Sequence, residues 1–145
     1  MAKALEVLSA RSSFLIMREA FYGTTRFDDF VQRVGITDAV AAARLRELVA
    51  DGLLAREPYR EPGQRTRHEY RLTEKGADLF PVLVALLQWG DRWLNDGGRV
   101  ELRHHDCGAR VGVEIRCAKG HEVAPGDLDL ATRPRPRRAS RSSAA

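Results

Sequence analysis

Three arginines, Arg60, Arg65 and Arg67, lie close together in a stretch punctuated by proline and glycine, PYREPGQRTR. Guanidinium groups on an exposed turn can bind phosphate oxygens or enter a narrow minor groove of DNA. An ordinary solvated hairpin is the alternative interpretation. The segments on either side of the cluster must therefore be considered to distinguish a DNA-binding hairpin from an ordinary solvated one.

A second group of reactive residue types lies further along the chain: His104, His105, Cys107, Cys117 and His121. Thiolate and imidazole groups bind zinc, and Cys107, Cys117 and His121 with either His104 or His105 could supply four ligands. The sequence has no CxxC pair, which favours the alternative of small thiols and solvated histidines. We therefore expect no metal and no cofactor.

Nothing in the sequence indicates an enzyme. It has no Ser/His/Asp pattern, no paired-carboxylate pattern, and no glycine-rich phosphate loop after a strand.

The sequence begins with two predicted helices, Ala2–Ala10 and Phe14–Tyr22. The second of them is apolar on most sides and is therefore predicted to be buried. Ser12 and Ser13 are candidate caps for that helix, and Gly23 ends it.

Two short amphipathic segments precede the arginine cluster. Thr25 and Asp28 match a capping box that would start the first helix, whose apolar face is Phe27, Phe30, Val31 and Val34. Gly35 forms the turn, Ile36 fills it, and Thr37 caps the second helix. This arrangement predicts a helix-turn-helix.

The second helix has an inward stripe of Ala41, Leu45, Leu48 and Val49. Its opposite face has Ala39, Ala42, Ala43 and Arg46, with Arg44 on one flank. Alanines chosen for helix propensity are one explanation, and close entry into a DNA groove is the other.

After Gly52, Leu53–Glu57 and His68–Leu72 are predicted strands that flank the turn Pro58–Gly63. A basic hairpin directly after a helix-turn-helix is typical of a wing, and this order favours DNA binding. The predicted DNA-binding residues are Arg26, Thr37, Asp38, Ala39, Ala42, Ala43, Arg44, Arg46, Arg60, Gln64, Arg65 and Arg67.

Thr73 caps a long predicted helix that runs to about Asn95 and is kinked at Pro81. Its apolar surplus exceeds what one small domain can cover, so part of it is predicted to form a dimer interface. A contact inside the same chain is the alternative. The residues in question are Leu83, Leu86, Leu87, Trp89 and Trp93.

Composition and charge narrow the class of protein. The 145 residues carry a net charge of +4, but five of the 24 basic residues lie in 131–145, leaving 19 basic against 20 acidic residues elsewhere. DNA affinity must therefore come from local patches. No apolar run is long enough to span a membrane, and no signal peptide is recognisable, which predicts a cytoplasmic protein with reduced cysteines.

Four pieces of the sequence together resemble the bacterial HxlR-type winged-helix transcriptional regulators: FLIMREAFYGTTRFDDF, VGITDAVAAARLRELVADGLL, YREPGQRTRHEYRLTEKG and LFPVLVALLQWGDRW. The resemblance covers roughly residues 3 to 95, and it places the chain among MarR-like regulators. It implies a homodimer through the first and last long helices, which adds Leu5 and Leu8 to the interface. It also implies recognition by the helix from Thr37 and by the wing from Pro58 to Arg67.

The chain departs from the pattern of these regulators at three places. The helix entry, usually Gly-Lys-Trp-Thr, is Ala10-Arg11-Ser12-Ser13. Ala39 and Ala43 stand where Asn and Asp are usual, and the N-terminal cysteine that senses oxidants in some members is absent. The segment HHDCG with its later cysteine resembles an extension that some members have.

The predicted fold class is mainly α (α+β): a winged helix-turn-helix with a long C-terminal dimerisation helix and a small β-hairpin extension. The predicted domains are 1–98, the Cys/His extension 99–130, and a disordered basic tail 131–145. The predicted function is transcription regulation by a homodimer on an inverted-repeat operator, with any small-molecule effector unknown. The alternatives are a winged-helix protein-interaction module and a thiol or metal sensor built on Cys107 and Cys117.

Overall fold

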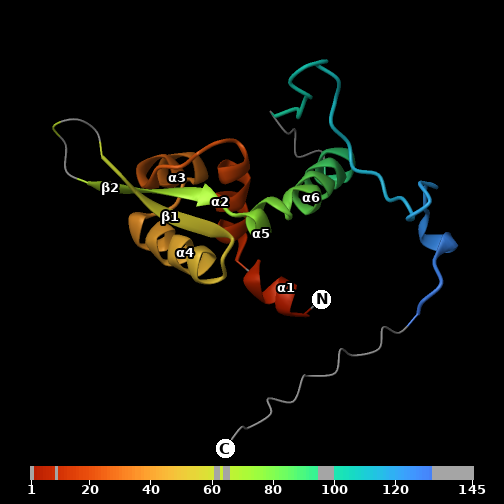
Figure 1. Cartoon of the computed structure of the whole chain (residues 1–145), viewed down its shortest axis with the longest axis horizontal. Coiled ribbons are helices and arrows are strands. Elements are labelled where there is room, and N and C mark those ends of the chain that lie inside the picture. Colours follow the sequence, from red (N-terminus) through yellow and green to blue (C-terminus); the bar gives the residue numbers. More distant parts are fainter. Residues whose placement is uncertain (1, 9, 61–62, 64–65, 95–99, 132–145) are drawn as a thin grey trace, which may run out of the picture. The chain divides into compact units, whose positions relative to one another are not determined.

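The computed structural model describes residues 2–8, 10–60, 63, 66–94 and 100–131. The chain divides after Val113 into two compact units, 1–113 and 114–145. The described elements are α1 (Ala2–Val7), α2 (Arg11–Phe21), α3 (Phe27–Val34), α4 (Asp38–Ala50), β1 (Leu54–Tyr59), β2 (Arg67–Leu72), α5 (Glu74–Ala77), α6 (Phe80–Trp93) and η1 (Pro125–Asp127). The first unit is the predicted mainly helical fold with one small antiparallel sheet (Figure 1).

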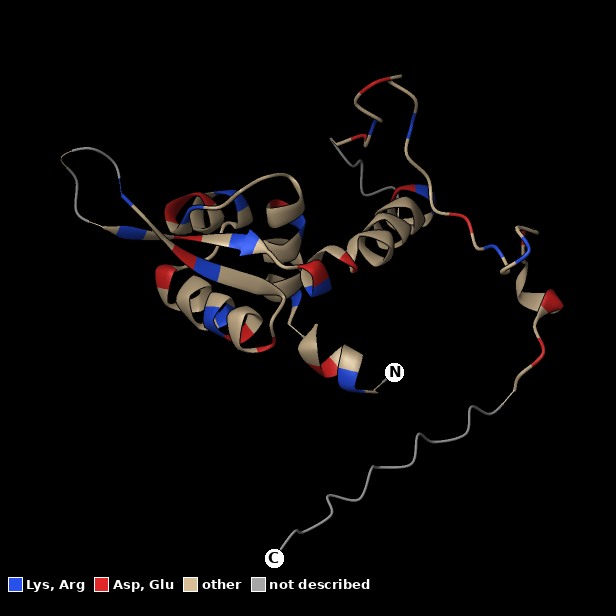
Figure 2. Ribbon diagram, viewed as in Figure 1, with Lys and Arg blue, Asp and Glu red and all other residues tan. Residues whose placement is uncertain are grey.

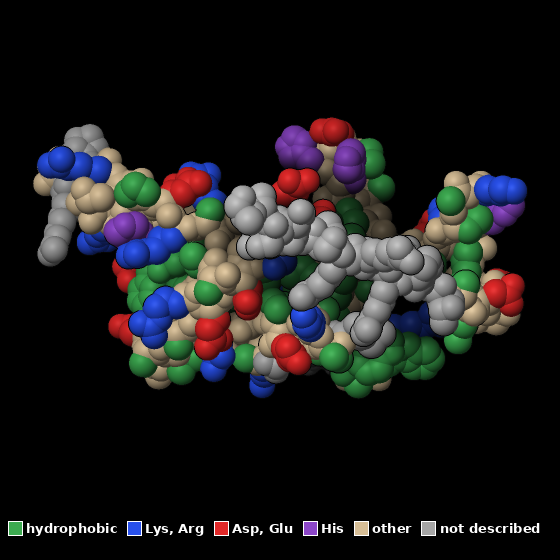
Figure 3. All heavy atoms as spheres, turned by 60° about the horizontal axis from the view of Figure 1, so that its bottom comes forward, with side chains coloured by type: hydrophobic (Ala, Val, Ile, Leu, Met, Phe, Trp, Pro, Cys, Tyr) green, Lys and Arg blue, Asp and Glu red, His purple; other side chains and the backbone are tan. Residues whose placement is uncertain are grey.

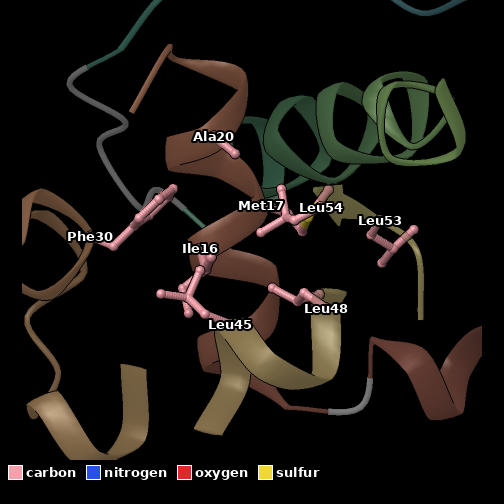
Figure 4. Packing of buried hydrophobic residues seen from close by; sticks show 8 residues of the cluster. All are labelled: Ile16, Met17, Ala20, Phe30, Leu45, Leu48, Leu53 and Leu54. Carbon is pink, nitrogen blue, oxygen red and sulfur yellow. The ribbon is translucent and has the colours of Figure 1, made fainter. Parts of the chain in front are cut away.

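The core of the first unit forms around α2, which is apolar on most sides. Ile16 and Met17 are buried with Phe30 of α3, and with Leu45 of α4 (Figure 4). Burying each such side chain contributes about 1.5–3 kcal/mol. The same cluster includes Ala20, Leu48, Leu53 and Leu54. The cluster therefore packs the helix-turn-helix against the base of the hairpin.

The turn between α3 and α4 forms as predicted. Gly35 takes a left-handed conformation with φ 70°, which costs a glycine little. The Thr37 hydroxyl accepts a hydrogen bond from the Val40 amide at 3.4 Å and caps α4. The inward stripe of α4 is confirmed, since Ala41, Leu45 and Leu48 are buried.

The predicted start of α3 is wrong. Thr25 does not cap this helix, which begins at Phe27 with Arg26 as its N-cap residue and no side-chain cap. The carbonyl of Thr25 instead accepts the Tyr70 amide at 2.8 Å, and Arg26 forms an antiparallel bridge with Glu69. The extended backbone at 25–26 is therefore used to pair with β2, so β2 has partners on both edges.

The two strands form a wing with a defined register. Leu54 pairs with Leu72 at the base, and Tyr59 pairs with Arg67 at the far end. Pro58 lies inside β1 rather than in the turn where it was predicted. An edge strand tolerates a proline because its outer edge needs no amide donor.

The predicted long helix from Thr73 is two helices, α5 and α6. Thr73 caps α5 as expected, because its hydroxyl accepts the Gly76 amide at 3.0 Å. Pro81 lies in the first turn of α6, where a missing amide hydrogen costs nothing, so it starts a helix instead of kinking one.

The start of α2 also differs from prediction. This helix begins at Arg11 with Ala10 as its N-cap residue, and neither Ser12 nor Ser13 caps it. Both serines lie inside the first turn, and Ser13 is buried.

No helix in the described part of the chain is long and apolar enough to cross a membrane.

The Cys/His extension is two separate turns and not one β-hairpin. An isolated bridge between Arg103 and Arg110 closes the first, and one between Arg116 and Glu122 closes the second. The backbone at 111–115 has no ladder partner among the described residues. The basic tail predicted at 131–145 falls, after Ala131, outside the described residues.

Candidate nucleic-acid interface

The outward face of α4 is small and accessible. Thr37, Asp38 and Ala39 at its N-terminal end are exposed, whereas Ala42 and Ala43 are half-buried. Val40, which was not among the predicted DNA-binding residues, is also exposed. A surface of methyl groups and short polar side chains allows close approach to a DNA groove and to thymine methyl groups.

Two arginines of α4 lie in different surroundings. Arg46 is exposed and makes no side-chain hydrogen bond or ion pair with the described part of the chain. Arg44 is half-buried and pairs with Glu47 one turn along, and its Nε is buried without a hydrogen-bond partner. Arg46 is therefore the long donor available on this face, while the charge of Arg44 is already compensated.

The wing adds further cations. Arg60 and Arg67 are exposed near its end, and Gln64 and Arg65 lie outside the described residues. Arg56 was not predicted from the sequence, and its Nη2 donates to Nδ1 of His68 across the strands at 3.0 Å. On the wing, at the left of Figure 3, blue basic side chains gather beside a purple histidine.

Arg26, predicted as a DNA contact, has a partner on the wing. Its Nη1 donates to the Tyr59 hydroxyl at 2.9 Å, and its guanidinium carbon lies 4.4 Å from the centre of the Tyr59 ring. The two residues are 33 positions apart in sequence. The contact joins the start of α3 to the outer end of β1.

Acidic residues limit the basic surface to certain positions. On one face of the wing, Arg71 pairs with Glu69 at 2.7 Å and with Glu57 at 3.3 Å. The hydrogen bond to Glu69 raises the pKa of Arg71. Figure 2 shows blue and red segments on the same helices and strands, so acidic residues lie among the basic ones.

Part of the predicted dimer surface is exposed and part is interior. On α6, Leu86 is 52% exposed, Trp89 53% and Trp93 64%, and Leu5 of α1 is similarly exposed. Leu83 is buried within the chain, Leu8 packs against the core, and Leu87 is half-buried. Three more exposed apolar residues on or next to α6 were not predicted as interface residues: Phe80, Val82 and Leu94.

A shallow apolar groove runs between α2 and α6. It is lined mainly by Phe14, Leu15, Leu83, Leu86 and Leu87. Tyr22 lies at its edge, where burial raises the pKa of the phenol and the nearby Arg18 partly offsets this. The exposed side chains of α6 therefore adjoin a hollow that can receive bulky apolar groups.

The two turns of the extension repeat one pattern, which was not predicted from the sequence. In the first, Arg103 bonds Glu101 through Nε at 2.8 Å and the carbonyl of left-handed Gly108 through Nη1 at 2.9 Å. In the second, Arg116 bonds Glu114 at 3.0 Å and the carbonyl of left-handed Gly120 at 2.9 Å.

The candidate zinc ligands are distributed between these turns. Cys107 Sγ lies 3.4 Å from Nδ1 of His104 in the first turn. The Cys117 amide donates to the carbonyl of His121 at 2.9 Å in the second. Among the described residues, no cluster of three or more His, Cys, Asp or Glu side chains is arranged to hold a metal.

The sequence of this chain is similar to those of known helix-turn-helix regulators. A sequence profile of the HxlR-like helix-turn-helix family matches residues 7–97. The uncharacterised helix-turn-helix-type transcriptional regulator Rv3095 of Mycobacterium tuberculosis is 44% identical over 124 residues, covering 83% of this chain and 77% of its own length. The uncharacterised regulator YvaP of Bacillus subtilis is 32% identical, covering 64% of this chain and 85% of its own.

Solved structures give the same result. The crystal structure of PA1607, a proposed transcription factor, superposes with a TM-score of 0.80 at 38% identity, covering 90% of this chain and 92% of that one. The redox regulator HypR in its reduced form superposes with a TM-score of 0.58 at 29% identity, covering 66% and 96%. The fold is therefore that of winged-helix transcription factors.

Proposed function

Since the chain belongs to the HxlR-like helix-turn-helix family, whose matched relatives are named as transcriptional regulators, we propose that it binds operator DNA as a homodimer. In this proposal α4 enters the major groove and the wing contacts phosphates or a minor groove. The protein would act in the cytoplasm, where its operator lies. Fold alone does not establish these details, so they must be argued from the two surfaces.

The observation that supports the proposal best is the outward face of α4. Its N-terminal end, Thr37 to Val40, is exposed, and Arg46 follows on the same helix with no partner among the described residues. Guanine is the base that arginine binds most often, through two hydrogen bonds. Alanine methyl groups at 39, 42 and 43 offer only apolar contact, which favours thymine. We therefore infer an operator rich in A·T pairs, with one position that Arg46 specifies.

The wing supplies affinity more than specificity. Arg67 is exposed at the outer end of β2 and makes no side-chain hydrogen bond within the described residues. A cation in such a position neutralises a phosphate and releases counterions, so binding must weaken as salt rises. Arg60 and, in the segment outside the described residues, Arg65 are further candidates for this role. Gln64, in the same segment, is uncharged and would donate only a neutral hydrogen bond to a phosphate oxygen.

The homodimer is supported by the exposed apolar residues of α6. Trp89 and Trp93 lie four positions apart on one helix and are both more than half exposed. Exposed tryptophans beside an apolar groove are typical of an interface between subunits. Figure 1 shows the wing extending away from α6, so a dimer formed through α6 would leave α4 and the wing accessible. Two such subunits would bind an inverted repeat.

Fluorescence anisotropy on labelled duplexes tests the proposal. Arg67→Ala should weaken binding to cognate and scrambled duplexes alike and flatten the salt dependence by about one unit, because one phosphate is no longer neutralised. Arg46→Ala should relax sequence preference at a cost of about 1–3 kcal/mol. Lys3→Ala, which removes one charge from exposed α1, is the matched control and should change neither. Unchanged affinity and salt slope for Arg67→Ala would refute the wing contact.

A further inference from the structure

The outer end of the wing has little core packing to hold it. From the base outward, Leu54 is buried and Ala55 half-buried, while Arg56 to Pro58 are exposed. On β2, Arg67 and His68 are exposed as well. A two-stranded hairpin without packing is marginally stable, so another contact must fix its direction.

Tyr59 is an exception to this gradient. It is half-buried, although it lies at the far end of β1 between exposed Pro58 and exposed Arg60. Its contact is Arg26, which donates to its hydroxyl at 2.9 Å and lies over its ring at 4.4 Å. The contact comes from outside the hairpin, because Arg26 is the N-cap residue of α3.

The backbone of Arg26 is itself fixed to the sheet. It bridges Glu69, which pairs with Glu57 on β1, whereas Tyr59 lies two residues further out on that strand. Side chains two residues apart share one face of a strand. Arg26 therefore reaches across β2 and outward, from the start of the helix-turn-helix to the outer end of the wing.

We propose that Arg26 is a positioning residue: by binding the hydroxyl and the ring of Tyr59, it fixes the direction in which Arg67 reaches the DNA backbone. This inference rests on the proposed function for its effect on DNA, but the contact itself exists in the free protein. It differs from the role predicted for Arg26 from the sequence, which was direct contact with DNA.

Hydrogen exchange of the free full-length protein tests the contact without DNA. Arg26→Ala should speed exchange in a peptide covering the outer strand pairs by about two- to fivefold, the factor expected for an exposed cation–π pair. Tyr59→Phe keeps the ring and loses only the hydroxyl that accepts from Arg26, so it should speed exchange by less. Arg26→Lys should behave like Arg26→Ala, because lysine lacks the planar fork that both stacks and donates. Arg33→Ala, an exposed arginine on the same helix, should leave exchange unchanged.

Salt dependence of DNA binding tests the consequence. Arg67→Ala should flatten the salt slope by about one unit in the wild type but by much less in the Arg26→Ala background, because the wing is then no longer held in place. If Arg26 were a direct phosphate contact, Arg26→Lys would keep wild-type exchange and slope, and the Arg26 and Arg67 effects would add. That result would overturn the inference. A wild type that binds no DNA would refute the proposed function, while the exchange measurement would still decide whether the contact holds the wing.

Discussion

Replacement of Gly76 by alanine should destabilise the protein because α5 packs directly on the base of the wing. A Cβ atom at this position would lie 2.1 Å from the Leu53 carbonyl oxygen and 3.3 Å from Cδ2 of Leu72. An ordinary contact between carbon and oxygen is about 3.3 Å or longer, so α5 must move by about 1 Å. Rotation of a side chain cannot relieve the clash, because the nearest atom belongs to the backbone.

The size of the effect follows from what that movement disturbs. The Leu53 carbonyl accepts the Thr73 amide at 3.1 Å, and the Thr73 hydroxyl donates to the Gly52 carbonyl at 2.6 Å. Overpacking costs about 1–3 kcal/mol, and weakening one such hydrogen bond costs about 1 kcal/mol more. Replacing glycine by alanine in a helix returns about 0.5–1 kcal/mol. The net loss of unfolding free energy is therefore about 2 kcal/mol.

Thermal unfolding followed by circular dichroism measures this loss. For a folded unit of this size the expected decrease in Tm is about 8 °C. Gly90→Ala is the matched control: it is also a helical glycine, but nothing lies within 4 Å of the position that its Cβ would take, so stability should be unchanged or rise by up to about 1 kcal/mol. Equal Tm values for Gly76→Ala and the wild type would refute the packing of α5 on Leu53.

Three further predictions concern association, pH and metal. Trp93→Glu or Leu86→Glu should give monomers in sedimentation, because each places a charge on the exposed apolar face of α6, and a wild type that sediments as a monomer at micromolar concentration would contradict the dimer. Burial raises the pKa of the Tyr22 phenol above 10.0. The stabilisation that comes from keeping this phenol protonated is therefore complete below about pH 10 and is lost as pH rises through the raised pKa. Tyr22→Phe should lose less stability than the wild type over that range, and equal losses would contradict the shift. Purified protein should contain less than one zinc per chain, and a stoichiometric zinc that is lost in Cys107→Ser would overturn that expectation.

The helix-turn-helix could be predicted from sequence because its determinants are local. Gly35 provides the left-handed turn, and Thr37 caps the helix that follows it. The inward stripe of α4 follows from helical periodicity alone. Each of these features depends on residues within a few positions of one another, so the printed sequence contains all of the information needed.

The start of α3 could not be predicted in this way, because a distant strand competes for the same backbone. Thr25 and Asp28 match a capping box, but the Thr25 carbonyl accepts a hydrogen bond from Tyr70, 45 positions later. Pairing with β2 keeps residues 25–26 extended and delays the helix to Phe27. The partnership of Arg26 with Tyr59 follows from the same pairing and was missed for the same reason.

The sequence did not distinguish the exposed apolar residues of α6 from the buried ones, because helical periodicity does not tell which apolar side chains the chain itself covers. Leu83 and Trp93 both belong to the apolar surplus of α6, yet Leu83 is buried in the chain and Trp93 is 64% exposed. A new helix begins at Phe80, and Leu83 on that helix lies beside Phe14 and Met17 of α2. Which side of α6 meets α2 therefore depends on contacts between residues that are far apart in the sequence.

Selection of bound duplexes from a random pool by the purified full-length protein tests the central claim most directly. We expect enrichment of an inverted repeat rich in A·T pairs, with half-site centres about one helical turn or a small multiple apart. We also expect the enriched duplex to bind more weakly as salt rises. Recovery of no common sequence, or of a single asymmetric site, would contradict a dimer that recognises its operator through α4 and the wing.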